Sequence, residues 1–289
     1  MNSDSPAMDR YFVIGNPIAH SKSPQIHARF AELTGQAMDY QRQLAPLDGF
    51  TATLAQLLQG GAQGCNVTVP FKFEAFKAAR TQSDRAQLAQ AANTLVMSPG
   101  DLHADNTDGI GLVRDIQVNA GVPLAGRDVL LIGAGGAGAG ALGPLLMAAP
   151  RRLVLVNRTR PRADALAAQH RAHASLQEAL LKTELIVQDL QAVEGDFDVI
   201  INASASSLDG CAVPVSHRVL KPGALACDLM YGPAAAGFMA WATAHGARPR
   251  DGLGMLVEQA AESFTLWRGM HPPAAQVLRE LRAQLEPLA

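Results

Sequence analysis

The sequence lacks a strong charge excess, a cysteine framework and any histidine pair with metal-ligand spacing. Its 289 residues carry 24 Lys and Arg against 26 Asp and Glu, and a net charge of −2 gives no reason to expect a nucleic acid as main partner. Cys65, Cys211 and Cys227 are isolated, which predicts reduced, buried residues of a cytoplasmic protein. The eight histidines include no HExxH motif, so we expect no metal.

Neither a targeting segment nor a membrane span is expected. The first residues, MNSDSPAMD, are polar and acidic without an apolar core, which argues against a signal peptide, and Met8 is an alternative start. The stretch 129–150 is uncharged, but its six glycines and two prolines make it a poor lipid-facing helix.

What the sequence does contain is a glycine-rich stretch after a short apolar run. Val129–Ile132 ends at Gly133, and Gly135 and Gly138 complete a G-x-G-x-x-G spacing. Read as strand, turn and helix, this is the dinucleotide-binding fingerprint, because glycines let the backbone approach a pyrophosphate and the helix N-terminus offers free N–H groups. Short motifs of this kind also occur without a ligand, so the pattern alone leaves nucleotide binding open.

The next apolar run, Leu153–Val156, ends in a basic loop. Cofactors with a free ribose 2′-hydroxyl usually meet an acid there, but this chain has Asn157 followed by Arg158, Thr159 and further arginines. Two charge-assisted bonds of about 1.5 kcal/mol each favour a 2′-phosphate by roughly 3 kcal/mol, about a hundredfold. The alternative is a solvated helix start. We expect NADP(H) as cofactor.

Two serines precede the first expected helix. Ser23 fits an N-cap with Pro24 at the first helical position, and an ordinary cap is the simplest interpretation. Ser21 adds a second hydroxyl beside the positive end of the helix, so the two together could hold a carboxylate without a fixed charge.

Three further polar positions attract attention. Asn66 and Thr68 alternate with apolar neighbours and therefore share one face of an expected strand. Lys72 opens the following helix, where most lysines are simply solvated. Asp108 precedes an expected helix, Gly109–Ala120, and capping that helix is a sufficient role for it.

Alternating strands and helices predict an α/β protein of two domains. The segment 108–251 is expected to form a doubly wound Rossmann-type domain, and 1–107 a smaller α/β domain completed by C-terminal helices within 252–289. The expected strands are Tyr11–Ile14, Tyr40–Leu44, Ala91–Val96, Asp101–Ala104, Val129–Ile132, Leu153–Val156, Asp198–Asn202 and Ala224–Asp228. The expected helices include Phe50–Leu58, Gly109–Ala120, Ala163–His170, Phe238–His245 and Ala274–Leu285.

A series of motifs in fixed order gives the chain a family resemblance. From Tyr11 to about Leu285 it resembles the shikimate dehydrogenase family, through GNPIAHSKSPQIH, NVTVPFK, AANTL, DNTDGIG, IGAGGAG, VNRTRPR, DLMYGP and DGLGMLVEQA. The resemblance implies NADP-dependent interconversion of 3-dehydroshikimate and shikimate in aromatic amino-acid biosynthesis. We also expect a small-molecule substrate, no nucleic-acid or membrane partner, a cytoplasmic location, and a monomer or homodimer.

The resemblance assigns roles to residues position by position. Lys72 and Asp108 match the catalytic lysine and aspartate. Substrate-binding positions are matched by Ser21 and Ser23, for the carboxylate, and by Asn66, Thr68, Asn93, Tyr231 and Gln259. Cofactor-binding positions are matched by Gly133, Ala134, Gly135, Gly136, Ala137, Asn157, Arg158, Thr159, Arg162, Leu229 and Gly252.

The chain departs from the family pattern at three places. Many members have Ser and a basic residue where this chain has Gly138 and Ala139, and often Met where it has Leu229. The Asn-Ala-Thr-Ser motif is replaced by Asn202–Ala205. None of these changes touches Lys72 or Asp108, so the expected activity is retained.

The expected mechanism is an ammonium–carboxylate pair acting on a ketone. Hydride addition builds negative charge on the carbonyl oxygen, which Lys72 would polarise and protonate while Asp108 orients the lysine and binds an adjacent hydroxyl. Two alternatives stay open: a quinate/shikimate dehydrogenase of broader substrate or cofactor use, and a non-catalytic NADP-binding regulator.

Overall fold

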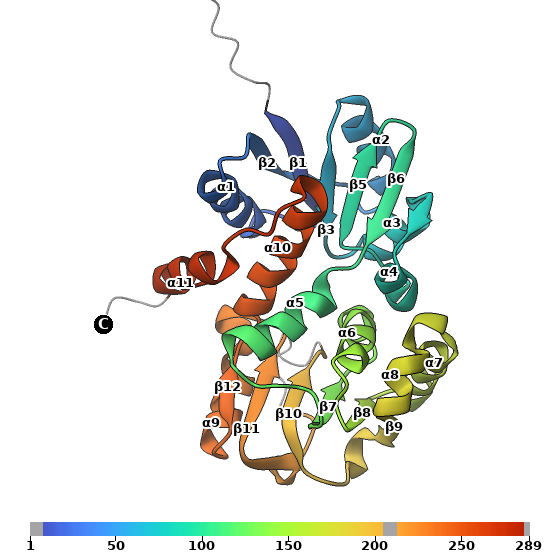
Figure 1. Cartoon of the computed structure of the whole chain (residues 1–289), viewed down its shortest axis with the longest axis vertical. Coiled ribbons are helices and arrows are strands. Elements are labelled where there is room, and N and C mark those ends of the chain that lie inside the picture. Colours follow the sequence, from blue (N-terminus) through green and yellow to red (C-terminus); the bar gives the residue numbers. More distant parts are fainter. Residues whose placement is uncertain (1–7, 205–212, 286–289) are drawn as a thin grey trace, which may run out of the picture. The chain divides into compact units, whose positions relative to one another are not determined.

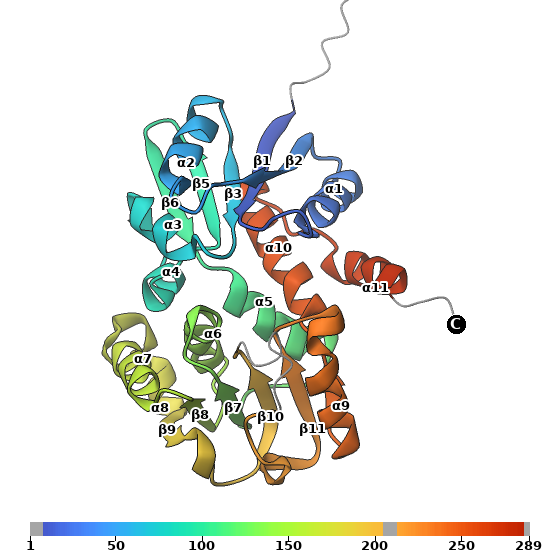
Figure 2. The same cartoon turned by 180° about the vertical axis from the view of Figure 1, so that it is seen from behind.

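The computed structural model describes residues 8–204 and 213–285 (Figures 1 and 2). Cys211 and Ala205 lie outside the described residues. The chain divides into two compact units: unit 1 runs through Thr107 and includes Val257–Ala283, and unit 2 is built on Asp108–Leu256.

Unit 1 is a mixed sheet of short strands. Its strand order is β2-β1-β3-β5-β6-β4, with β1 parallel to β2 and β3, and with β5 antiparallel to β3 and β6. The strands are β1 (Asp9–Gly15), β2 (Met38–Leu44), β3 (Gly64–Val67), β4 (Thr81–Gln82), β5 (Thr94–Ser98) and β6 (Asp101–Asp105).

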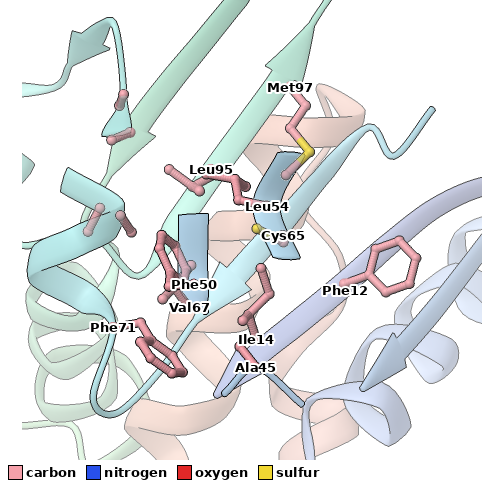
Figure 3. Close-up of a cluster of buried hydrophobic side chains, with 14 of the residues drawn as sticks. Phe12, Ile14, Ala45, Phe50, Leu54, Cys65, Val67, Phe71, Leu95 and Met97 are labelled. Carbon is pink, nitrogen blue, oxygen red and sulfur yellow. The ribbon is translucent and has the colours of Figure 1, made fainter. Parts of the chain in front are cut away.

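Helices pack on this sheet through a core of buried apolar side chains. Figure 3 shows part of this core, where the rings of Phe50 and Phe71 stack at 5.3 Å beside Val67 and Leu95. Trp267 ties α10 to the sheet by donating its indole N–H to the Leu95 carbonyl at 3.0 Å. The helices are α1 (Ser23–Thr34), α2 (Phe50–Gln59), α3 (Lys72–Ala78), α4 (Asp84–Ala89), α10 (Leu253–Arg268) and α11 (Ala274–Leu285).

Unit 2 is a fully parallel sheet in the order β12-β11-β10-β7-β8-β9. Counted along the unit, this is the 3-2-1-4-5-6 order of dinucleotide-binding folds, with the strand order reversing between β7 and β10. The strands are β7 (Asp128–Ile132), β8 (Arg152–Asn157), β9 (Glu184–Asp189), β10 (Phe197–Asn202), β11 (Leu220–Asp228) and β12 (Arg248–Arg250).

Helices cover the strands of unit 2 and connect them along the chain (Figure 1). The α-helices are α5 (Asp108–Arg114), α6 (Gly136–Met147), α7 (Arg160–Ala172), α8 (Gln177–Lys182) and α9 (Ala236–Ala244). A π-helix, Asp115–Asn119, continues α5. Both the two-domain α/β architecture and the Rossmann-type sheet predicted from the sequence are confirmed.

Several local predictions are wrong. Ser23 is the first residue of α1 and not its cap, because Lys22 holds the N-cap position without a side-chain hydrogen bond. Asp108 likewise begins α5 as a helical residue, and the predicted helix changes to π geometry after Arg114. Strands β9 and β12 were not predicted, since both lie at sheet edges where one neighbour and partial exposure permit polar residues.

No helix in the described part of the chain combines the length and apolarity needed to cross a bilayer. Over the same residues, no group of three or more His, Cys, Asp or Glu side chains is arranged to hold a metal ion.

Candidate active site

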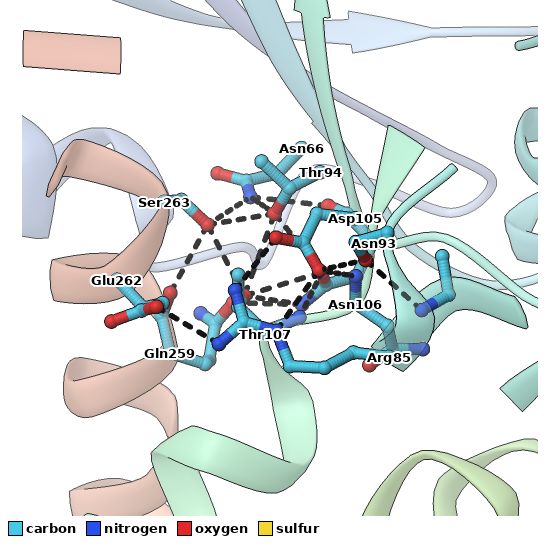
Figure 4. Close-up of polar contacts among 12 residues, drawn as sticks. Asn66, Arg85, Asn93, Thr94, Asp105, Asn106, Thr107, Gln259, Glu262 and Ser263 are labelled. Atoms are coloured by element: carbon cyan, nitrogen blue, oxygen red, sulfur yellow. Dashed lines mark hydrogen bonds and ion pairs between the residues drawn. The ribbon is translucent and has the colours of Figure 1, made fainter. Parts of the chain in front are cut away.

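Three amide side chains form the centre of a buried polar network in unit 1. Asn66, Asn93 and Gln259 are 6%, 3% and 8% exposed and come from β3, the residue before β5, and α10 (Figure 4). The Asn93 amide donates to the Gln259 side-chain oxygen at 3.1 Å, and its own oxygen accepts the Thr107 N–H at 2.8 Å. The structure therefore brings together two of the predicted substrate residues by a direct hydrogen bond.

Asn66 joins the same network through hydroxyl groups. Its amide nitrogen donates to Ser263 Oγ at 2.9 Å and to Thr94 Oγ1 at 3.1 Å. Its oxygen accepts the phenol proton of Tyr40 at 2.7 Å. These bonds fix the orientation of an amide that could otherwise rotate, so the donor and acceptor sides of Asn66 are assigned by its neighbours.

The two predicted carboxylate-binding serines lie together at the start of α1. Ser23 is buried, and its backbone N–H donates to Ser21 Oγ at 3.3 Å. Arg42 from β2 holds the Ser21 carbonyl through its guanidinium at 2.7 Å. The sequence predicted a helix-end pair of hydroxyls, and the structure adds this arginine, which was not predicted.

Lys72 and Thr68 occupy the segment between β3 and α3. Thr68 follows the strand directly, and its N–H donates to the Ile14 carbonyl at 2.9 Å. Lys72 is the half-buried first residue of α3, and its carbonyl accepts the N–H of Ala92 at 2.9 Å. Lys72 is thereby anchored beside the residue that precedes Asn93. Asp108 is the buried first residue of α5, in unit 2.

The glycine-rich turn of unit 2 brings the start of α6 close to the end of β7. Gly133 follows β7 with φ +113°, a backbone conformation that residues other than glycine rarely adopt. A Cβ atom on Gly138 would overlap the Gly133 carbonyl, so the helix can start this close to the strand only with glycine there. Gly135, by contrast, has open space where its Cβ would stand, at the N-terminus of α6.

A side chain at position 138 would meet the Gly133 carbonyl, so the serine that many family members carry there would require α6 to shift. The turn therefore presents backbone groups at this position.

The arginines of the basic loop after β8 differ in their contacts and exposure. Asn157 accepts the Ala134 N–H at 3.1 Å and donates to the Thr159 carbonyl at 2.9 Å, which links this loop to the glycine turn. Arg160 is engaged with Asp164 and Asp189 at 3.0 and 3.1 Å. Arg158 and Arg162 are exposed.

The remaining cofactor and substrate candidates lie after β11. Leu229 donates its N–H to the Asn202 carbonyl at 3.1 Å, and Gly252 donates its own to the Met230 carbonyl at 2.8 Å. The first bond connects the end of β11 to the end of β10, and the second connects the segment after β11 to the turn before α10. Tyr231 is half-buried, and burial raises the pKa of its phenol.

Several residues of the unit 1 network were not predicted from the sequence. Thr107 lies inside the DNTD motif, and Ser263 lies one turn after Gln259 on the same helix face, so helical spacing was the available signal. Thr94 lies inside the AANTL motif, and Tyr40 begins the expected strand Tyr40–Leu44, but neither position carries a signal of its own for this network.

Comparison with known proteins supports one family throughout. Residues 13–95 match the shikimate dehydrogenase substrate binding domain, residues 116–210 the shikimate/quinate 5-dehydrogenase family, and residues 252–282 the shikimate 5′-dehydrogenase C-terminal domain.

Similar proteins cover nearly the whole chain. A shikimate dehydrogenase (NADP(+)) of Acidovorax sp. strain JS42 is 64% identical over 96% of this chain and 98% of its own length. An Ael1 enzyme from Pseudomonas putida has a TM-score of 0.87 at 44% identity, covering 97% of this chain and all of that one. The shikimate 5-dehydrogenase of Thermus thermophilus, solved with NADP(H) and shikimate, has a TM-score of 0.82 at 31% identity, covering 96% and 100%. The chain belongs to the shikimate dehydrogenase family.

Proposed function

We propose that this chain catalyses the reversible, NADPH-dependent reduction of 3-dehydroshikimate to shikimate in aromatic amino-acid biosynthesis. The observation that carries the proposal is its 64% identity, over 96% of the chain, to a protein named as an NADP(+)-dependent shikimate dehydrogenase. The buried amides of unit 1 support it, because groups that both donate and accept suit a ring with several hydroxyls.

NADP(H) is assigned to unit 2. The pyrophosphate would bind to backbone groups of Gly133, Ala134, Gly135, Gly136 and Ala137, at the start of α6. The ribose phosphate would bind to Asn157, Arg158, Thr159 and Arg162, where Asn replaces the acid that would repel it. Leu229 and Gly252 would lie beside the nicotinamide, which supplies the hydride when bound.

The substrate carboxylate is assigned to Ser21 and Ser23, which the structure holds side by side. Its ring hydroxyls are assigned to Asn66, Thr68, Asn93 and Gln259, with Tyr231 lining the pocket. Lys72 donates a proton to the carbonyl oxygen as negative charge develops there, and Asp108 binds the adjacent hydroxyl. In the reverse direction Lys72 accepts the alcohol proton.

A matrix of two substrates and two cofactors tests the proposal. The purified chain is assayed with shikimate or quinate, each with NADP+ or NAD+, and kcat/KM is compared. We expect the highest value with shikimate and NADP+. A quinate value of similar size favours the broader quinate/shikimate dehydrogenase, whose family description the chain also matches. Tight NADP+ binding without turnover in any arm favours a non-catalytic regulator and contradicts the proposal.

Three finer assignments accompany it. Unit 1 is proposed as the substrate domain and unit 2 as the NADP domain. The chain is proposed to act as a monomer or homodimer, which light scattering of the purified protein decides. A cytoplasmic location is supported by Cys65 and Cys227, which are unpaired and buried.

A further inference from the structure

A partly buried ion triad lies next to the amide network of unit 1. Arg85 from α4 holds Asp105 with both ends of its guanidinium, Nε to Oδ1 at 3.0 Å and Nη2 to Oδ2 at 2.6 Å. Its remaining nitrogen, Nη1, donates to Glu262 on α10 at 2.9 Å. One guanidinium therefore joins three segments that are far apart in the sequence (Figure 4).

Both carboxylates of the triad are close in sequence to network residues. Asp105 ends β6, two residues before Thr107, whose N–H and hydroxyl donate to the Asn93 oxygen at 2.8 and 3.2 Å. Glu262 lies three residues after Gln259, which accepts from Asn93. The triad thus links the two chain segments that meet at Asn93.

The charges of the triad are balanced by many hydrogen bonds. Asp105 also accepts the Ser83 hydroxyl at 2.5 Å and the Asn106 N–H at 2.6 Å. Burial alone would raise the pKa of Asp105, but the bonds and charge of Arg85 lower it overall. A buried pair of this kind adds little net stability compared with apolar packing, whereas its directional bonds can fix one geometry.

We propose that Arg85 is a positioning residue for substrate binding, because its bonds to Asp105 and Glu262 hold Thr107 and α10 in the register that aligns Asn93 and Gln259. This inference rests on the proposed function of the amide network. Arg85 acts through Asn93 and Gln259, and its effect is on affinity for the polyhydroxylated substrate and not on the cofactor.

The test compares Arg85→Met with a matched control in the same unit. Arg268 on α10 is similarly buried, its side chain 15% exposed against 22% for Arg85, and it forms an ion pair with Asp9 and a bond to Gln36 at 2.8 Å. It lies more than two turns beyond Gln259. For both variants, KM for shikimate, KM for NADP+, kcat and thermal midpoint are measured.

We expect Arg85→Met to raise KM for shikimate about tenfold, equivalent to about 1.4 kcal/mol, with KM for NADP+ within about twofold of wild type. Arg268→Met should lower the thermal midpoint comparably and leave both KM values unchanged. Arg85→Lys should restore part of the shikimate affinity. Equal KM changes in Arg85→Met and Arg268→Met, or no change in the former, would overturn the inference.

A milder variant, Glu262→Gln, keeps the inference testable if Arg85→Met does not fold. Glu262→Gln removes one charge and leaves the Arg85–Asp105 pair, and it should raise KM for shikimate about threefold. An unchanged KM for shikimate in folded Glu262→Gln counts against the inference. Wild-type protein without shikimate turnover would instead remove the proposed function, so the two failures are distinguishable.

Discussion

Units 1 and 2 build their candidate sites by different physical means. In unit 1, three of the predicted substrate residues, Asn66, Asn93 and Gln259, are buried side chains joined by hydrogen bonds. In unit 2, the predicted cofactor residues 133–137 form the turn at the start of α6, where the absence of side chains at Gly133 and at the neighbouring Gly138 sets the geometry. The comparison teaches that a side-chain network must be assembled from distant segments, whereas a backbone turn is encoded locally.

Substitutions should destabilise the side-chain network of unit 1 and the glycine turn of unit 2 for different reasons. Removing one member of a buried network leaves its partners without hydrogen bonds, at a cost of about 1–3 kcal/mol per group. Adding a methyl group to a close-packed glycine forces a helix away from its strand, which costs about 1–3 kcal/mol by overpacking. The following predictions separate these behaviours.

The largest effect is expected at Lys72. Lys72→Ala removes the proposed proton donor and should lower kcat at least about a hundredfold, because general acid catalysis contributes that much or more. KM for NADP+ should stay unchanged, because the cofactor is assigned to unit 2. The control is Lys77→Ala, an exposed lysine in the last turn of the same helix. A loss below about tenfold in steady-state kcat would remove Lys72 from the mechanism.

A similar but selective effect is expected in the basic loop. The double variant Arg158→Ala/Arg162→Ala should reduce the preference for NADP+ over NAD+ about a hundredfold, as two charge-assisted bonds are lost. Arg160→Ala is the control, since Arg160 is engaged with Asp164 and Asp189. The ratio of kcat/KM for the two cofactors measures the effect. An equal change in the Arg160 variant would show that overall charge, not position, determines preference.

The glycine turn should separate stability from affinity. Gly138→Ala places a Cβ against the Gly133 carbonyl and should lower the free energy of unfolding by about 1–3 kcal/mol. Gly135→Ala has room for its Cβ, so it should fold normally while weakening NADP+ binding, where the cofactor backbone must come close. Denaturant unfolding and NADP+ titration of both variants check this. Equal stability losses would contradict the distinction.

The effect that is smallest at neutral pH concerns a buried histidine of unit 1. His27 stacks on Tyr40 with ring centroids 4.3 Å apart, and neither of its ring nitrogens has a hydrogen-bond partner among the described residues. Burial lowers the pKa of His27 to about 3, and its contact with Asn66 opposes this only in part. The unfolded chain therefore binds the proton first as pH falls below about 6.5, so stability declines by about 1.4 kcal/mol per pH unit between about pH 6.5 and 3.

His27→Phe should remove that contribution and flatten the stability profile in this window, without changing it above about pH 7. Chemical unfolding at several pH values measures the slope. His20→Phe, at an exposed position, serves as the control. A profile of His27→Phe parallel to wild type would show that His27 does not control the acid sensitivity.

Much of unit 2 could be predicted from the sequence. Val129–Ile132 and Leu153–Val156 are short apolar runs before turn residues, a pattern typical of buried parallel strands. Both lie within the observed strands β7 and β8. β9 was not predicted because it begins at Glu184 and ends at Asp189, and its side chains are partly exposed at the sheet edge.

The network of unit 1 was less predictable. Motif matching singled out Asn66, Asn93 and Gln259, and Ser263 and Thr107 lie close in the sequence to motif residues. No local pattern, however, identifies their hydrogen-bond partners or shows that Arg85 bridges Asp105 and Glu262. These contacts depend on how strands and helices separated by up to 197 positions pack together. Periodicity specifies which face is buried, and tertiary packing specifies the partners.

The most direct test of this division is a crossed binding measurement by calorimetry. Shikimate and NADP+ are titrated into Gln259→Met and into Arg158→Ala. The account predicts that Gln259→Met weakens shikimate binding about tenfold with NADP+ unchanged, and that Arg158→Ala weakens NADP+ about tenfold with shikimate unchanged. If either variant weakens both ligands to the same extent, recognition is not divided between the two units in this way.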